Sequence, residues 1–583
     1  MTVGARWNFL HLTWIMLSLC GGALFMYRLA LALVNRSLID FVSSERYLLG
    51  VFPLLSFSLF LFHGRHGVEE WDEFSHWALV SKSLILTDAL PTVSSNVIFK
   101  DYPEGSGLFH YFISRFFSGF HESLLYYAQS LLIFSFVFAL LLPPFATKDR
   151  WVRGAQALFF VGGVAYYYKV GKVYSTLLVD QLLGCMFAFL LVCSWYEAQR
   201  KKGPGWPWGS LILLFTFPLI KKSGLFLALL GGAGILISYA YHQRPRFRGW
   251  ILLVGLLGSL PILSQYLWSS WVSENQFARV FPVRASASVL RAIWDPSQSD
   301  SFQIQVLSRF ATAMTETPVG RYFDGLSAVF HSPVSYATLF MSFGLFAAFI
   351  CGKGRSFLAA KSIYLLAGFG AFHFGLLYLY LTSFVPHEAL ELASFERYST
   401  TYILGWGLLL FCMIQHVLAT QVKWTLTLGL LFTVLIAAST PWRELKLKAA
   451  GRSPISSELK SALSRIEQKT PVGSRILFIA QESKGFEIFV ANYELAPQRK
   501  VNVFDFWWIV PPHRAVTPWT TPLSQDELKV RILYYQFVYL LKLDENFCAD
   551  YRLVFGADEC QEGRLFAVEA EHHRYKQLVP ISE

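Results

Sequence analysis

The densest group of ionisable side chains in the sequence lies in the segment EEWDEFSHWALVSK, residues 69–82. Its first five residues contain four carboxylates, and Trp71 and Trp77 flank the acidic pair Asp72 and Glu73. On a helix, Asp72 and His76 would share one face. A carboxylate within hydrogen-bond reach of a hydroxyl can take its proton, so the segment could supply a general base. A solvated helix at a membrane surface, with its tryptophans in the aromatic belt, would show the same residues.

A second polar group follows in KDYPEGSGLFHYF, residues 100–112. Lys100 could bind a phosphate, and Asp101 and Tyr102 could bind the rest of a substrate. The Pro and Gly residues predict a turn that leads into an aromatic amphipathic helix. The two groups therefore belong to one loop whose ends both carry polar side chains.

Isolated charges stand at the ends of long apolar runs. Lys221 and Lys222 follow one run, Asp180 begins another, and Arg397 precedes a third. A charge at the edge of a membrane is costly unless it faces a cavity or a partner, and an arginine suits bidentate binding of phosphate. Two simpler interpretations stay open: the lysines could reach out to lipid headgroups, and Arg397 could cap its loop with Glu396.

The elements that must position these residues are apolar. Of the 583 residues, 54% are hydrophobic and only 15% are charged, against about 25% in soluble domains. This composition excludes soluble, fibrous, disordered and disulfide-scaffold proteins and predicts an α-helical polytopic membrane protein. Runs long enough for about twelve transmembrane helices start near Phe9, Tyr47, Leu124, Ala155, Tyr174, Trp208, Gly224, Trp250, Val334, Ser362, Ser399 and Trp424.

The net charge of +11 is carried by short basic clusters between apolar runs. Clusters of this kind mark cytoplasmic loops, so binding of nucleic acid is not expected. The long polar stretches 64–122, 273–331 and 441–583 then lie outside the cytoplasm. The expected division is a transmembrane catalytic domain, residues 1–440, and a C-terminal extracytoplasmic domain, residues 441–583.

The C-terminal segment has the pattern of a small α/β domain. An amphipathic helix, Ser456–Glu467, precedes a strand-like run at Arg475–Ala480, a helical stretch to Tyr493 and a second strand-like run at Lys500–Phe504. Its two cysteines, Cys548 and Cys560, could pair in an oxidising compartment, although the sequence does not fix their distance.

Taken together, these motifs resemble the GT-C superfamily of membrane glycosyltransferases, which includes protein O-mannosyltransferases and the lipid A aminoarabinose transferase. The resemblance lies in the acidic pair Asp72-Glu73 on the first external loop, the element LysAspTyrPro at residues 100–103, and the helix that ends the loop. The family's Lys-Pro-Pro is LysAspTyrPro here, and two spans precede the loop.

The resemblance implies an enzyme that transfers a sugar, with inversion, from a polyprenyl-phosphate donor to a glycan, lipid or protein acceptor of the cell envelope. Asp72 and Glu73 would be catalytic. Lys100, Lys221, Lys222 and Arg397 would hold the donor phosphate, and His76, Asp101, Tyr102 and Asp180 would contact the substrate. A divalent cation, Mg or Mn, could take part. The expected location is the bacterial inner membrane, with the site on the periplasmic side.

Two other functions stay open. An O-antigen ligase or polymerase would use diphosphate-linked glycans and would rely on Arg and His of a later loop. A transporter or flippase of lipid-linked glycans would usually show internal repeats or broken helices in matching halves. Only the glycosyltransferase hypothesis requires a carboxylate at position 72.

Overall fold

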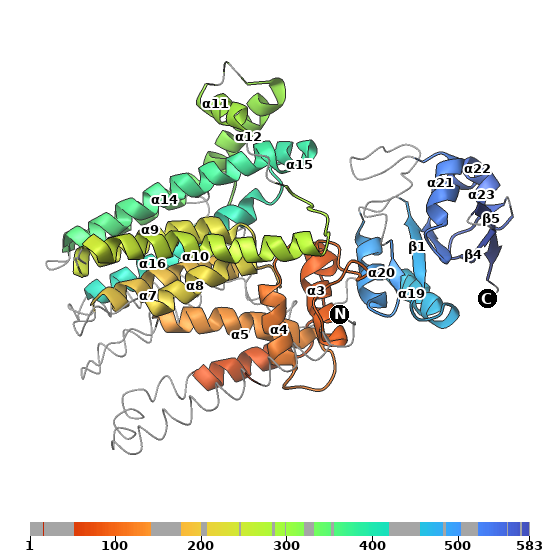
Figure 1. Ribbon diagram of the computed structural model, residues 1–583, viewed down its shortest axis with the longest axis horizontal. Helices are drawn as coiled ribbons and strands as arrows, with labels where there is room; N and C mark the ends of the chain where they lie inside the picture. The colour runs from red at the N-terminus through yellow and green to blue at the C-terminus, as the bar shows by residue number, and fades with distance from the viewer. Residues whose placement is uncertain are drawn as a thin grey trace.

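The computed structural model of the protein describes residues 16, 52–141, 176–199, 207–243, 247–282, 286–295, 297, 299–319, 332–350, 355–418, 455–481, 485–502, 523–556, 558–571 and 574–581. A bundle of long helices fills one part of the molecule, and a small sheet flanked by helices lies at one end of it (Figure 1).

Within the described ranges, five helices are long and apolar enough to cross a membrane. They are α5 (Glu122–Leu141), α7 (Asp180–Gln199), α9 (Gly224–His242), α10 (Phe247–Glu274) and α14 (Arg355–Thr382). Shorter apolar helices are Phe52–His63, α8 (Trp208–Ile220) and α13 (Pro333–Ile350), and α16 (Phe395–Leu418) is a further long helix. These helices support the prediction of a polytopic membrane protein. The spans predicted near Phe9, Ala155 and Trp424 lie outside the described residues.

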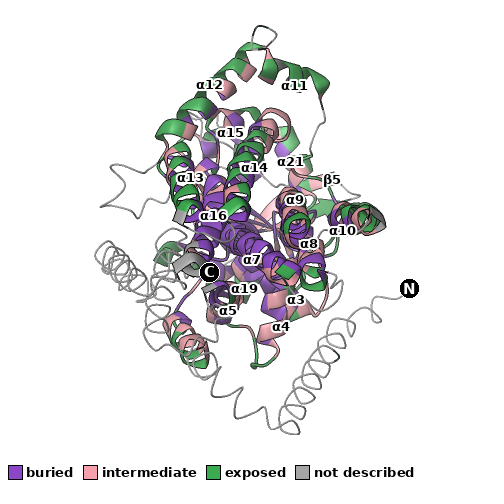
Figure 2. Ribbon diagram, turned by 90° about the vertical axis from the view of Figure 1, so that its left-hand side faces the viewer, coloured by how far each residue is buried: buried purple, intermediate pink, exposed green. Residues whose placement is uncertain are grey.

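Helices α7 and α16 form the buried centre of the bundle (Figure 2). Glycines let their backbones touch, because a Cβ on Gly184 would lie only 2.5 Å from the carbonyl oxygen of Thr401. Small residues allow such close helix packing in membranes. Gly184 is one turn beyond Asp180, and Thr401 is one turn beyond Arg397. The glycine contact therefore places Asp180 and Arg397 side by side.

The polar loops carry short helices. The first loop contains the π-helical turn η2 (Glu73–Trp77), α3 (Ala78–Thr87) and α4 (Gly105–Ser114). A Cβ on Gly105 would lie 2.5 Å from the carbonyl oxygen of Leu219, so α4 begins directly against the end of α8. Later loops contain α11 (Ala287–Trp294), α12 (Ser301–Glu316) and α15 (Pro386–Leu390).

The C-terminal part contains a five-stranded sheet in the order β2-β1-β3-β4-β5. Its strands are β1 (Arg475–Ala480), β2 (Lys500–Val501), β3 (Phe537–Lys542), β4 (Leu565–Glu571) and β5 (Arg574–Pro580). Strand β1 pairs in parallel with β2 and β3, whereas β4 and β5 pair antiparallel. The helices are α19 (Ser457–Lys469), α20 (Phe486–Leu495), α21 (Gln525–Ile532), α22 (Phe547–Asp550) and α23 (Arg552–Phe555).

Alternate residues of β1 face two different cores. Ile476 and Phe478 join the core that continues from the membrane helices through α19 and α20. Leu477 and Ile479 join a second core under α21, α22 and α23. The sheet is thus attached to the membrane bundle by one of its two helical layers.

The predicted helix and the strand at Arg475–Ala480 are confirmed. The strand predicted at Lys500–Phe504 is described only for Lys500–Val501, and residues from 503 lie outside the described ranges. Cys548 and Cys560 form a disulfide, with their Cα atoms 5.6 Å apart.

Candidate functional site

Six charged side chains converge at the end of the bundle that faces the C-terminal sheet. They come from the first loop, the start of α7, the connection between α8 and α9, and the first turn of α16. We call this group the ion cluster, and it consists of Asp72, Asp101, Asp180, Lys221, Lys222 and Arg397. Its members are all residues that the sequence analysis selected.

Arg397 contacts two of the three carboxylates of the ion cluster. Its Nη1 donates to Asp72 Oδ2, and its Nε lies 3.3 Å from Asp180 Oδ2. Lys221 Nζ donates to the other oxygen of Asp180 at 2.7 Å. Two cations thus offset the cost of burying the Asp180 carboxylate, which would be large for an unpaired charge.

The second ion pair of the cluster lies beside Tyr102. Lys222 Nζ donates to Asp101 Oδ2, which also accepts from the backbone N–H of Val280 at 3.2 Å. The Lys222 ammonium lies 5.2 Å from the centre of the Tyr102 ring. Burial raises the pKa of the Tyr102 hydroxyl well above its usual value, with further contributions from Tyr398, Asp101 and Asp72. Tyr102 is therefore a neutral side chain beside the Lys222–Asp101 ion pair.

His76 is buried next to the same tyrosine, with the two ring centres 5.1 Å apart. Neither of its ring nitrogens has a hydrogen-bond partner within the described part of the chain. Burial, and then the charges of Lys221 and Lys222, lower the pKa of His76 to about 3. A neutral imidazole offers one donor and one acceptor, so His76 could serve a polar ligand.

Glu73 lies apart from the ion cluster and is fully buried. Its Oε2 accepts from Tyr126 at 2.6 Å and from the backbone N–H groups of Glu69 and Glu70, while Oε1 accepts from the N–H of Leu177 at 2.8 Å. Burial raises the pKa of Glu73 to about 7, and the hydrogen bonds from Tyr126 and Leu177 oppose that rise. This carboxylate fastens the Asp72 loop to the membrane helices.

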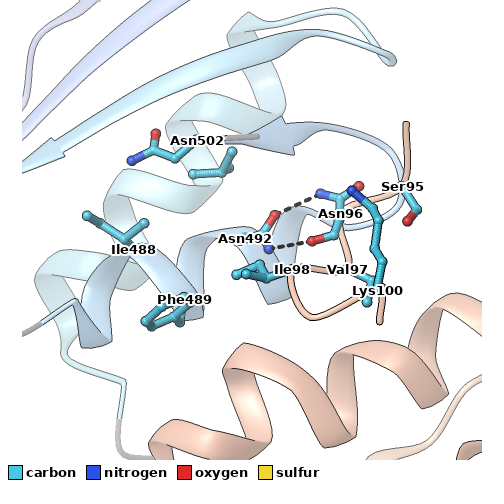
Figure 3. A pocket seen from close by; sticks show the side chains of 10 residues that line it. Ser95, Asn96, Val97, Ile98, Lys100, Ile488, Phe489, Asn492 and Asn502 are labelled. Carbon is cyan, nitrogen blue, oxygen red and sulfur yellow. Dashed lines mark hydrogen bonds between the residues drawn. The ribbon is translucent and has the colours of Figure 1, made fainter. Parts of the chain in front are cut away.

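Lys100 is also separate, and it faces the C-terminal domain. It lines a pocket of about 50 Å³ with residues of the first loop, α20 and β2 (Figure 3). In this pocket Asn96 Nδ2 donates to Asn492 Oδ1 at 2.9 Å. Burial, and then the charge of Lys500, lower the pKa of Lys100 to about 8.

Three further residues lie near the ion cluster and were not predicted from the sequence. The Tyr398 ring lies 4.7 Å from the Lys221 ammonium, and Trp268 Nε1 donates to the carbonyl oxygen of Asp101 at 3.0 Å. Burial, and then the charge of Asp72, raise the pKa of Glu388 to about 7. Tyr398 directly follows Arg397 and could have been selected with it, whereas no local pattern marks Trp268 or Glu388.

A divalent cation has no evident site in the described residues. No group of three or more His, Cys, Asp and Glu side chains there is arranged to hold a metal ion. Each carboxylate of the ion cluster is already paired with a cation.

No protein-family profile matches the sequence, and no curated protein matches it. The crystal structure of ArnT from Cupriavidus metallidurans in the apo state is similar to this chain, with a TM-score of 0.36 and 13% sequence identity. The alignment covers 91% of this chain and 97% of that one. A likeness at this level supports no assignment of activity.

Proposed function

We propose that the protein is a membrane glycosyltransferase that transfers a sugar from a polyprenyl-phosphate donor to a cell-envelope acceptor at the external, periplasmic face of the inner membrane. The convergence of one partly exposed carboxylate, Asp72, with three cations at one end of apolar helices carries this proposal. Such a site lies where a lipid-linked phosphate would be held.

Asp72 is the proposed general base. It takes the proton of the acceptor hydroxyl as that oxygen attacks the anomeric carbon of the sugar. Inversion requires the base on the face opposite the leaving phosphate. Glu73 positions Asp72 by fixing η2 to α5 and to the segment before α7.

Arg397, Lys221 and Lys222 stabilise the phosphate as its negative charge grows, because preorganised cations act most strongly where charge develops. Four further residues complete the site. His76 and Tyr102 contact the substrate, and the carboxylates of Asp101 and Asp180 hold the cations. Lys100 faces the C-terminal domain instead, so it takes no part in this scheme.

The test compares envelope glycans by mass spectrometry in cells that lack the protein and in cells that carry one variant. We expect Asp72→Asn to keep the shape of the side chain and to slow transfer by about 10²–10⁴-fold. Asp88→Asn is the matched control. Asp88 is on the same loop, pairs with Arg115, and has a positive φ of 55° that Asn tolerates.

A glycan species that is lost without the protein and restored by Asp88→Asn but not by Asp72→Asn would support the proposal. Full restoration by Asp72→Asn, at equal protein level, would exclude Asp72 as the base. An accumulation of unflipped lipid-linked glycan, with transfer chemistry intact, would favour the transporter hypothesis instead.

A further inference from the structure

We propose that binding of the donor phosphate displaces Asp72 from Arg397, so that the donor itself releases the base. In the structure the Asp72 carboxylate is bound to the guanidinium of Arg397. While this ion pair is in place, one oxygen of the Asp72 carboxylate is occupied by the Arg397 donor. This inference rests on the proposed function in one respect, that the incoming anion is a polyprenyl-linked phosphate.

The three carboxylates of the ion cluster differ in how firmly they are held. The side chains of Asp101 and Asp180 are 1% and 3% exposed, whereas that of Asp72 is 35% exposed. Removing a partner from a buried ion pair destabilises a protein much more than breaking an exposed pair does. Asp72 is therefore the partner that an incoming anion can replace.

The geometry of Arg397 allows this exchange without moving the arginine. Its Nε lies 3.3 Å from Asp180 Oδ2, and Lys221 binds the other oxygen of Asp180. The Nη1 that contacts Asp72 is then available to a phosphate oxygen, and arginine suits phosphate because its donors lie in a planar fork. Lys222, whose side chain is 32% exposed, lies next to Tyr102 and can bind the same phosphate.

The formal charges agree with the exchange. Three carboxylates and three cations sum to zero in the ion cluster, and a sugar phosphodiester adds one negative charge. During transfer the acceptor O–H bond breaks and its proton goes to Asp72, while a new bond forms between the acceptor oxygen and the anomeric carbon. The bond from that carbon to the phosphate oxygen breaks, and its electron pair stays on the phosphate. Asp72 loses one negative charge as the phosphate gains one, so the total charge does not change.

The exchange predicts that a variant without the base binds the lipid phosphate more tightly. We expect Asp72→Asn to lower the dissociation constant of polyprenyl phosphate by about fivefold, because Asp72 no longer competes for Arg397. Binding is measured with the full-length protein in phosphatidylcholine nanodiscs, by native mass spectrometry. Asp88→Asn, which removes the same charge from another Asp–Arg pair of the same loop, should leave the dissociation constant unchanged.

The Arg397→Gln background separates exchange from simple charge repulsion. The gain from Asp72→Asn should disappear there, because the shared partner is gone; a gain of undiminished size would overturn the inference. Equal or weaker binding by Asp72→Asn would also overturn it. Asp72→Ser is measured in parallel, so that a folding defect in one variant does not decide the result. Wild-type protein that shows no saturable binding of polyprenyl phosphate would instead reject the donor class of the proposed function.

Discussion

At the scale of single residues, the negative charge of Asp72 affects the pKa of a nearby carboxyl group, that of Glu388. Burial is the main reason that its pKa rises to about 7, and the negative charges of Asp72 and Glu391 add to the rise. One of its oxygens is buried and has no hydrogen-bond partner among the described residues. Glu388 is therefore neutral below about pH 7 and becomes charged above it.

Ionisation of Glu388 is expected to weaken donor binding. As the pH rises from 6 to 8, its new negative charge repels the donor phosphate, and we expect the dissociation constant of the sugar-phosphate donor to rise about three- to tenfold. The donor is a phosphodiester and keeps a single charge over this range, so the protein sets the change. Glu388→Gln should flatten the profile in a binding titration at several pH values. A profile with the same midpoint in this variant would assign the titration to another group.

The residues of the ion cluster could be selected from the sequence, but their pairing could not. Charge in or beside an apolar run is rare enough to mark Asp180, Lys221 and Lys222. Asp72 and Arg397, however, are 325 residues apart in the chain, and Lys222 and Asp101 are 121 apart. No local pattern predicts contacts at such separations. For the same reason Glu73 was assigned to catalysis, although its partners Tyr126 and Leu177 make it an internal anchor.

At the scale of elements, the first loop and the C-terminal domain are joined through α20. Lys82 Nζ donates to the carbonyl oxygens of Tyr493 and Glu494 at 2.7 and 3.1 Å, at the last turn of that helix. A lysine there satisfies carbonyl groups that have no partner within the helix and complements the helix dipole. Nearby, the rings of Trp71 and Phe489 lie 4.5 Å apart, and Phe74 contacts Tyr493.

Removing the Lys82 ammonium should loosen this junction. Lys82→Met keeps the apolar stem but loses two charge-assisted hydrogen bonds, each worth about 1.5–3 kcal/mol. Hydrogen exchange measured by mass spectrometry should then become faster in α20 and η2. Lys529→Met, which removes a partly exposed lysine from α21 of the same domain, should leave both elements protected. Unchanged exchange in Lys82→Met would show that the other contacts of α20 hold it without the lysine.

The elements themselves were more predictable than their junctions. Apolar length predicted the long helices, and capping by Ser456 agrees with the predicted start of α19. The π-helical turn at Glu73–Trp77 was not predicted, because its extra backbone residue depends on the internal partners of Glu73 rather than on local residue preferences.

At the scale of the whole molecule, the disulfide bears on the orientation of the chain. Disulfides persist in oxidising compartments and are rare in the cytosol. The Cys548–Cys560 bridge thus agrees with an external C-terminal domain, as the basic loops predict.

The bridge can be tested in cells with a protein whose other five cysteines are replaced by serine. After acid quenching and denaturation, a maleimide of high mass should shift the protein only when a reductant is added first. Cys560→Ser should leave Cys548 open to labelling without reductant. Two free thiols in the unreduced starting protein would contradict both the bridge and the external location of the domain.

The junction between Asn96 and α20 also orders events during synthesis. Asn96 bonds to Asn492, 396 residues further along the chain, and to the carbonyl oxygen of Arg499, 403 residues further along. A ribosome that adds roughly 5–20 residues per second needs about 20–80 s to make that interval. The loop that carries Asp72 is consequently synthesised well before α20, the helix that packs against it. A transcript truncated before Asn492 would yield an inserted protein whose first loop lacks its contacts with α20, and each complete chain makes these contacts only near the end of translation.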